Sequence, residues 1–171
     1  MEKLVKRKEI FDGKVIHVVL DEVSLDDGKI TNREVAMHRG GVCIGLKHND
    51  SYFLVRQYRY AQGKEMLEFP AGKIEKDENP DDAVLREAIE ETGFEAINVR
   101  KVGKMVPTCG YSSEIIHLYL GETGEYRGQN LDADERINVF EYRPEQIRKM
   151  IKDGTIDDGK TIALMYHIEN Q

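Results

Sequence analysis

Apolar residues recur at alternate positions in seven short segments of the chain, a pattern typical of β-strands. Two of these segments flank Asp26-Asp27-Gly28, a turn in which glycine accepts a positive φ, and they predict a hairpin. A second pair of segments flanks Asn49-Asp50. The strands are expected at residues 15–25, 30–38, 41–48, 52–60, 99–105, 115–120 and 137–142.

A helical period replaces this alternation after residue 79. Asn79 can cap a helix, Pro80 suits its first position and Gly93 suits its end, so a helix is expected over residues 80–92. Two further helices are expected, one after Pro144 and one from about residue 160 to residue 169. Strands mixed with three helices predict an α/β layered domain.

The composition describes one soluble globular domain of 171 residues, of which 40% are hydrophobic. The net charge of -7 is unevenly placed: residues 1–60 carry 11 basic and 9 acidic side chains, and residues 61–171 carry 14 and 23. A basic surface for duplex nucleic acid is therefore not expected. A phosphate-bearing substrate would need a bound cation to approach the acidic part of the chain.

No segment has the length and apolar character of a signal peptide or a membrane span, so we expect a cytoplasmic protein. The two cysteines, Cys43 and Cys109, lie far apart and lack a metal-ligand spacing. Cys43 belongs to an apolar run and is expected to be buried. The five histidines show no ligand spacing either.

Three carboxylates gather on one side of the expected helix over residues 80–92. At about 100° per residue, Glu87, Glu90 and Glu91 fall within roughly a 100° arc, and the opposite, apolar side is expected to bind the core. Like charges at these spacings repel, so the helix gives up stability unless a cation lies among them. Oxygen ligands of this kind suit Mg²⁺ or Mn²⁺, although a solvated acidic face is the ordinary alternative.

The residues around these glutamates resemble the Nudix box, G-x5-E-x7-R-E-U-x-E-E-x-G-U, where U is a bulky apolar residue. Its seven fixed positions are matched by Gly72, Glu78, Arg86, Glu87, Glu90, Glu91 and Gly93. Ala88 departs from the pattern, and looser packing beneath the helix is expected there. The resemblance implies an α/β/α sandwich with a mixed β-sheet, preceded by an N-terminal antiparallel β extension.

The resemblance also implies roles for residues of the box. Glu87 and Glu91, with the backbone oxygen of Ala71, resemble the main metal ligands. Glu90 is similar to a further ligand or to a catalytic residue that orients water.

The loop ahead of the helix is expected to support these ligands. Gly72 is expected to adopt a backbone conformation denied to other residues, so that a carbonyl approaches the metal. Arg86 is expected to pair with Glu90, and Glu78 is expected to hold the loop rather than take part in the chemistry.

Beyond the box, the chain is similar to ADP-ribose pyrophosphatases and related nucleoside-diphosphate-sugar hydrolases. The similar segments are residues 10–15, 33–35, 56–59, 67–72 and 154–161. In that subgroup three residues contact the substrate, and they correspond to Arg33, Arg59 and Glu68. The donor fork of arginine matches paired phosphate oxygens. A surface salt bridge for Arg33 and a structural pairing of Glu68 with an arginine are the alternatives.

The subgroup also places a catalytic glutamate in the acidic loop after the strand expected at residues 115–120. Asp132, Asp134 and Glu135 are candidates for this general base, and Glu135 is ranked first. Glu114 is a further carboxylate of this kind, with a solubility role at a strand edge as the alternative.

A competing motif lies near the C-terminus, where residues 154–161 satisfy the P-loop pattern G-x4-G-K-[ST]. The context does not fit, because residues 144–152 have a helical period whereas a P-loop follows a strand. Asp157 and Asp158 would also sit against the phosphates. A P-loop is therefore not expected.

The sequence thus predicts a Mg²⁺-dependent hydrolase, with Mn²⁺ as an alternative metal, that cleaves the diphosphate linkage of a nucleoside diphosphate sugar. ADP-ribose, giving AMP and ribose 5-phosphate, is the first choice, and GDP-mannose or another nucleotide sugar is the alternative. Thr108-Cys109-Gly110 stands where many hydrolases of ADP-ribose have Ser-Pro-Gly, a departure that bears on the substrate alone. A non-catalytic domain that senses a nucleotide sugar is the alternative of a different class.

Residues 1–40 are expected to form a β extension that serves as a dimerisation arm, and residues 41–171 the hydrolase domain. The resemblance implies a homodimer in which the arm is exchanged and Arg33 reaches the substrate of the partner subunit. The alternative is a hairpin that folds back onto its own core. Neither a nucleic acid nor a membrane is expected as a partner.

Overall fold

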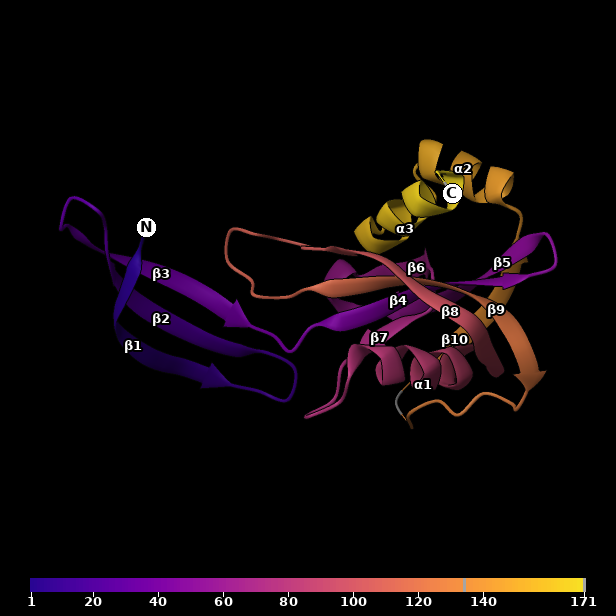
Figure 1. Ribbon diagram of the computed structural model, residues 1–171, viewed down its shortest axis with the longest axis horizontal. Helices are drawn as coiled ribbons and strands as arrows, with labels where there is room; N and C mark the ends of the chain where they lie inside the picture. Colours follow the sequence, from indigo (N-terminus) through magenta and orange to yellow (C-terminus); the bar gives the residue numbers. More distant parts are fainter. Residues whose placement is uncertain (134, 171) are drawn as a thin grey trace. The chain divides into compact units, whose positions relative to one another are not determined.

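Strand β4 (Gly41–His48) occupies the centre of the larger sheet, and its first six residues are buried. Successive side chains of a strand point to opposite faces, so Val42, Ile44 and Leu46 enter one hydrophobic cluster and Cys43 enters another. The computed structural model describes residues 1–133 and 135–170 (Figure 1). A continuous apolar run is what a strand buried on both faces requires, and the expected burial of Cys43 is confirmed.

Within the described residues, seven strands form this mixed sheet, in the order β10-β5-β4-β9-β8 with β6 beside β5 and β7 beside β4. β4 and β9 are parallel, and the other pairs are antiparallel. The strands besides β4 are β5 (Ser51–Arg59), β6 (Lys64–Glu68), β7 (Ala71–Lys73), β8 (Phe94–Met105), β9 (Ile116–Tyr126) and β10 (Ile137–Tyr142). A short 3-10 turn, η1 (Tyr60–Gln62), separates β5 from β6.

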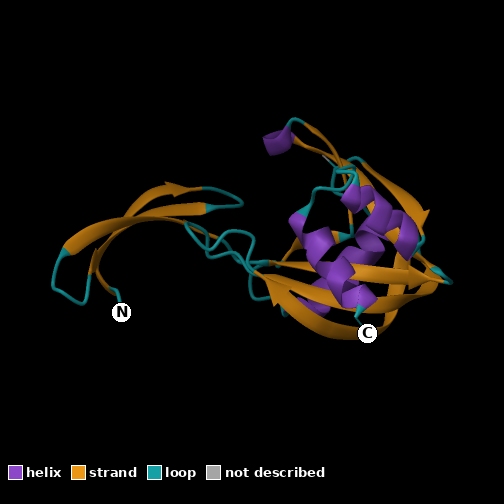
Figure 2. Ribbon diagram, turned by 90° about the horizontal axis from the view of Figure 1, so that it is seen from above, coloured by secondary structure: helices purple, strands orange, loops and turns teal. Residues whose placement is uncertain are grey.

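Helices cover both faces of the sheet, α1 (Pro80–Thr92) on one side and α2 (Pro144–Lys152) with α3 (Gly159–Glu169) on the other (Figures 1 and 2). Ala83, Val84 and Ala88 of α1 pack with Val42 and its neighbours. On the opposite face, the core contains buried residues of α2 and α3, namely Ile147, Leu164 and Met165. The predicted α/β/α sandwich is confirmed.

The ends of α1 follow from its sequence. The Asn79 side chain accepts a hydrogen bond from the Asp81 amide at 3.0 Å, and Pro80 occupies the first turn. Gly93 ends the helix with a φ of 80°, and its amide donates to the Ile89 carbonyl at 2.8 Å. Each of these three roles is as predicted.

A separate three-stranded antiparallel sheet is formed by β1 (Lys3–Asp12), β2 (His17–Ser24) and β3 (Ile30–Met37), in that order. The predicted hairpin turn lies between β2 and β3, with Gly28 at a φ of 82°. In β2, Asp21 is buried and accepts from Arg7 at 2.8 and 2.7 Å. This sheet belongs to a compact unit made of residues 1–40 and 106–115, and the remaining residues form the other unit.

Several strands differ from their predicted extent. β8 begins five residues before the predicted strand and β9 continues six residues beyond it, because cross-strand pairing carries them through polar sequence. β1 was not predicted, since each of its ten residues is exposed and leaves no hydrophobic period to detect. In the described part of the chain, no helix is long and apolar enough to cross a membrane.

Candidate active site

Arg86 lies among the glutamates of α1. Its Nη1 atom donates to Glu87 Oε1 and to Glu90 Oε2, each at 2.8 Å, which confirms the expected pairing with Glu90. The cation that offsets repulsion between these carboxylates is therefore a side chain of the same helix. Repulsion along the helix is by itself no indication of a metal ion.

Glu91 is buried, with 3% of its surface exposed. Its Oε2 atom accepts a hydrogen bond from the Ala71 amide at 2.9 Å. Burial raises the pKa of Glu91 to about 8; the Ala71 amide opposes this shift, and the charges of Glu87 and Glu135 add to it. Glu91 thus lies inside the fold rather than on the side facing away from the core, because β7 packs against this part of α1.

Gly72 is required for a reason other than the one predicted. It does not have a positive φ, so the expectation of a special backbone conformation is wrong. A Cβ atom at this position would instead lie 1.9 Å from Glu87 Cδ and 2.0 and 2.2 Å from the carboxylate oxygens. Glycine therefore allows the Glu87 carboxylate to pack directly on the backbone of β7.

Glu78 holds the loop between β7 and α1, as expected. Its Oε1 and Oε2 atoms accept from the Arg86 guanidinium at 2.8 and 3.0 Å, and Oε2 also accepts from the Glu75 amide at 2.8 Å. The Arg86 hydrogen bonds are the main reason that the pKa of Glu78 is lowered. Arg86 also donates to the Lys73 carbonyl at 3.0 Å, so one guanidinium joins the loop to the glutamates of the helix.

The donor atoms at this end of α1 are of the type that a divalent cation prefers. Glu91 is a buried carboxylate that accepts from a backbone amide and takes part in no ion pair of the described residues. Carboxylate and carbonyl oxygens are the ligands that Mg²⁺ and Mn²⁺ prefer. Across residues 1–133 and 135–170, however, no group of three or more His, Cys, Asp or Glu side chains is arranged closely enough to hold a metal ion. Glu87 and Glu90 would have to exchange contacts with Arg86 for contacts with the ion.

The acidic loop before β10 brings a further carboxylate toward the helix. Burial is the main cause of the raised pKa of Glu87, and the negative charge of Glu135 contributes to it as it does for Glu91. The Glu135 amide donates to the Asp132 carbonyl at 2.9 Å, while the Asp132 side chain is exposed. Asp134, the third candidate base, lies outside the described residues. Glu135 is therefore the candidate with a defined electrostatic link to the helix glutamates.

Arg59 and Glu68 form a two-pronged ion pair between β5 and β6. Arg59 Nε donates to Glu68 Oε1 at 2.8 Å, and Arg59 Nη2 donates to Glu68 Oε2 at 2.6 Å. Glu68 is 1% exposed, whereas 37% of the Arg59 side chain is exposed. This arrangement supports the alternative reading of Glu68 as the structural partner of an arginine, and a direct contact of Glu68 with substrate stays a prediction.

Arg33 and Glu114 belong to the unit that contains the three-stranded sheet. Arg33 Nε donates to Glu2 Oε2 at 3.1 Å in an exposed ion pair, the surface salt bridge weighed as its alternative. Glu114 Oε1 lies 3.6 Å from His38 Nδ1, which accepts from the Gly40 amide at 2.9 Å. The roles of Arg33 and Glu114 in catalysis stay predictions.

Sequence reasoning did not assign Lys160 a role, although its side chain contacts Glu68 and Asp158. The signal was present in the Gly159-Lys160-Thr161 pattern that was set aside as a P-loop. Rejection of the P-loop was correct, because Lys160 points at two carboxylates of the fold.

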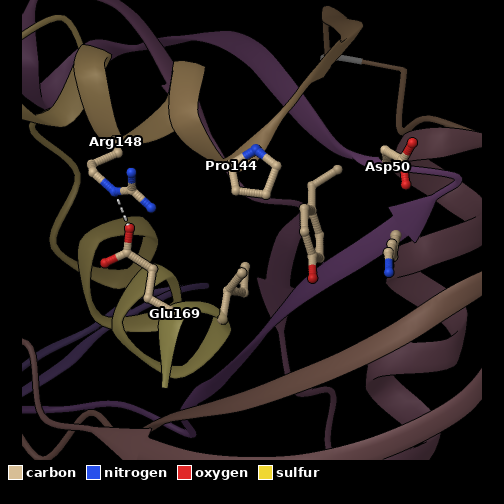
Figure 3. Close-up of a pocket in the computed structure, with 7 residues that line it drawn as sticks. Asp50, Pro144, Arg148 and Glu169 are labelled. Carbon is tan, nitrogen blue, oxygen red and sulfur yellow. Dashed lines mark hydrogen bonds and ion pairs between the residues drawn. The ribbon is translucent and has the colours of Figure 1, made fainter. Parts of the chain in front are cut away.

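A separate cavity of about 460 Å³ lies between β4, β5, α2 and α3 (Figure 3). Its lining carries charges of both signs, and Arg148 is paired with Glu169 across it. None of the residues that sequence reasoning assigned to the site lines this cavity. It therefore does not belong to the candidate active site.

Together, the three-layer fold and the glutamates at the end of α1 define an α/β enzyme built on a loop–helix motif. A family model described as the NUDIX domain matches residues 37–165. The chain belongs to the Nudix family of hydrolases.

Relatives of known description cover nearly the whole chain. It is 34% identical to the methanol dehydrogenase activator of Bacillus methanolicus, over 99% of this chain and 94% of that protein. It is 32% identical to the ADP-ribose pyrophosphatase of Bacillus subtilis, over 98% of this chain and 92% of that protein. It is also 32% identical to the GDP-mannose pyrophosphatase of Shigella flexneri, over 97% of this chain and 94% of that protein. A solved structure described as an ADP compounds hydrolase shares the fold with a TM-score of 0.87 at 17% identity, over 99% of this chain and 92% of that one.

Proposed function

We propose that this protein hydrolyses the diphosphate linkage of a nucleoside diphosphate sugar, with ADP-ribose, giving AMP and ribose 5-phosphate, as its first substrate. The observation that carries the proposal is the buried Glu91 carboxylate held against the Ala71 amide, within a Nudix box whose seven fixed positions are all matched. The ADP-ribose pyrophosphatase of Bacillus subtilis supports this choice of substrate. The GDP-mannose pyrophosphatases support GDP-mannose as the alternative at the same identity.

The reaction depends on a divalent cation, Mg²⁺ or Mn²⁺. Glu87, Glu90 and Glu91, with the backbone oxygen of Ala71, are the residues that would hold it. When bound, such an ion would neutralise the charge of the diphosphate and would supply Lewis-acid chemistry that makes water a better nucleophile. The net charge of the chain, -7, makes this neutralisation necessary for an anionic substrate.

Glu135 accepts the proton of the attacking water. Its support is the electrostatic link to Glu87 and Glu91, which locates it near the helix carboxylates. Asp132, Asp134, Glu90 and Glu114 are the other candidates for this role.

Arg59 binds the diphosphate, and its exposed guanidinium supports this role. Because Nε and Nη2 already contact Glu68, the remaining Nη1 atom is the donor left for a phosphate oxygen. Glu68 either fixes Arg59 or reaches the substrate itself.

Residues 1–40 form the dimerisation arm and residues 41–171 the hydrolase domain. The protein is a cytoplasmic homodimer with exchanged arms, and Arg33 completes the partner's site. Its partners are small nucleotide sugars, and neither nucleic acid nor membrane is a partner. The acidic net charge supports the exclusion of nucleic acid.

Steady-state kinetics test the proposal on a panel that includes ADP-ribose, GDP-mannose and other nucleotide sugars, with Mg²⁺ and with EDTA. We expect the highest kcat/KM for ADP-ribose, release of AMP, and loss of turnover in EDTA. A preference for GDP-mannose would select the alternative substrate. Binding of the panel without turnover would select the non-catalytic sensor, against which the complete set of helix glutamates argues.

A further inference from the structure

A network of buried charge lies behind Arg59. Glu68, the last residue of β6, is 1% exposed, and its Oε1 atom accepts from Arg59 Nε at 2.8 Å. Its Oε2 atom accepts both from Arg59 Nη2 at 2.6 Å and from Lys160 Nζ. Glu68 is therefore shared by two cations that come from opposite ends of the larger unit's sequence.

Lys160 is the more buried of the two cations that contact Glu68. Only 12% of its side chain is exposed, compared with 37% for Arg59. Its ammonium group makes a second contact, to Asp158 Oδ1 at 2.9 Å. A long, flexible lysine is costly to desolvate in the interior, and here the two carboxylates offset that cost while Lys160 links Glu68 to Asp158.

The start of α3 holds this arrangement in place. Asp158 caps the helix through Oδ2, which accepts from the Thr161 amide at 2.9 Å and from the Thr161 hydroxyl at 2.6 Å. The Thr161 hydroxyl oxygen in turn accepts from the Phe69 amide at 2.9 Å. Since Phe69 follows Glu68 directly, the backbone beside Glu68 and the side chain of Lys160 are both fixed by the same helix terminus.

The charges of the network balance: Arg59 and Lys160 are positive, and Glu68 and Asp158 are negative. Arg59 is the member with the most exposed side chain, and it lines a cavity of about 380 Å³ together with Glu68, Asp158 and Lys160. Its Nη1 atom has no hydrogen-bond partner within the described residues. The network therefore presents one oriented donor group to the cavity and keeps its other charges satisfied.

We propose that Lys160 is a positioning residue for substrate: through Glu68 it fixes the guanidinium of Arg59 in the orientation that receives the diphosphate. The proposal rests on the proposed function, because it takes a diphosphate as the ligand of Arg59. Lys160 itself does not touch the substrate. Removing its charge leaves Glu68 with Arg59 alone and Asp158 without its counter-ion. The Glu68 carboxylate is then less firmly fixed, and so is the Arg59 guanidinium that it holds.

The test compares Lys160→Met, Lys160→Gln and Lys160→Arg with a matched control, Lys64→Met. Lys64 pairs with Asp157 at the neighbouring junction of β6 with the segment before α3, but about half of each side chain is exposed. Folding is checked by circular dichroism and melting temperature. Lys160→Gln keeps a polar side chain, so the comparison survives if the methionine variant fails to fold.

Two readouts are taken: the Kd for ADP by calorimetry, and KM with kcat for ADP-ribose at saturating Mg²⁺. For Lys160→Met and Lys160→Gln we expect Kd and KM to rise about tenfold with kcat within about threefold of wild type. Lys160→Arg and Lys64→Met should stay within about threefold of wild type in all three constants. A change confined to melting temperature, or a loss confined to kcat, would overturn the proposal.

A double-mutant cycle shows whether Lys160 acts through Arg59. If it does, Arg59→Met combined with Lys160→Met should bind ADP no more weakly than Arg59→Met alone. Losses that multiply would contradict this route. A wild type that binds ADP but turns over no nucleotide sugar would defeat the proposed function, while the ADP comparison would still decide the role of Lys160. A wild type that binds no ADP would overturn both.

Discussion

The carboxylate of Glu87 occupies the space that a side chain at Gly72 would need. The three closest approaches to a Cβ atom placed there are 1.9, 2.0 and 2.2 Å, all to the end of the Glu87 side chain. A glutamate of α1 and the backbone of β7 are therefore in direct contact, and the position of one determines the position of the other.

Gly72→Ala should displace Glu87 and reduce turnover by about 10²-fold, because a shift of about 1 Å at a reacting group costs that much. Overpacking should also lower the free energy of unfolding by about 1–3 kcal/mol. Steady-state kinetics and urea unfolding measure the two effects. Gly110→Ala is the control for stability, since its Cβ atom meets nothing within 4 Å. Normal turnover in a folded Gly72→Ala variant would remove Glu87 from the active site.

Glu91→Gln should abolish most turnover while preserving the fold. The substitution keeps the shape of the side chain and the oxygen that accepts from Ala71, but it removes the charge that the proposed cation needs. A loss of at least about 100-fold is expected, since charge stabilisation by a bound ion contributes several kcal/mol. Turnover at saturating Mg²⁺ and the melting temperature check the prediction. An active variant with a normal melting temperature would exclude Glu91 as a ligand.

The same substitution should change how stability depends on pH in EDTA. The folded-state pKa of Glu91, about 8, exceeds its unfolded value of about 4.3, so the stability that its proton contributes is present below pH 4.3 and is lost as the pH rises toward 8. Glu91→Gln does not titrate. The melting temperature of the variant, measured relative to that of wild type, should therefore rise as the pH increases from 5 to 8. A difference that stays constant over this range would contradict a buried, unpaired Glu91.

Among three substitutions in the acidic loop, Glu135→Gln should lose the most activity. A general base contributes about 10²- to 10⁴-fold to the rate, and Glu135 is linked electrostatically to Glu87 and Glu91. Asp132→Asn and Asp134→Asn are the matched comparisons, because each removes one charge from the same loop. If all three variants retain activity within a few-fold, the base lies elsewhere, and Glu114→Gln is the next variant to measure.

Mixed dimers should reveal whether Arg33 serves a neighbouring subunit. Arg33→Ala and Glu91→Gln chains with different affinity tags are allowed to exchange and the heterodimer is isolated. With exchanged arms, one of its two sites has both residues intact, so activity should recover to about half the wild-type value, whereas the parent dimers stay inactive. A monomer by sedimentation, or verified heterodimers without recovery, would mean that the arm folds back on its own chain.

The sequence predicted α1 in detail, because its signals are local. Asn79, Pro80 and Gly93 act within one turn of the helix, and Arg86 meets Glu90 across a single turn. Burial of Glu91 could not be predicted in the same way, since it depends on β7, a strand of three residues that is too short to show a period. The helical period places all three glutamates on one side of α1, and it does not indicate which of them is buried.

Ion pairs between residues that are distant in the sequence could not be predicted either. The pairing of Arg59 with Glu68 was weighed as an alternative, since nine positions separate residues on adjacent strands. Lys160 contacts Glu68 across 92 positions, and its local pattern pointed to a phosphate loop instead. A lysine between glycine and threonine has the same sequence signal whether it binds phosphate or a buried carboxylate, so only the fold distinguishes the two.

The parallel pairing of β4 with β9 has a consequence for the order in which the chain acquires structure. Gly41 lies opposite Ile116, a separation of 75 positions, whereas β4 meets β5 through a two-residue turn. Closing so long a loop is entropically costly, so this contact is expected to form late in folding. During synthesis, α1 with its glutamates is translated before β9. The sheet on which this helix packs is therefore complete only after β9, a strand translated later, has paired with β4.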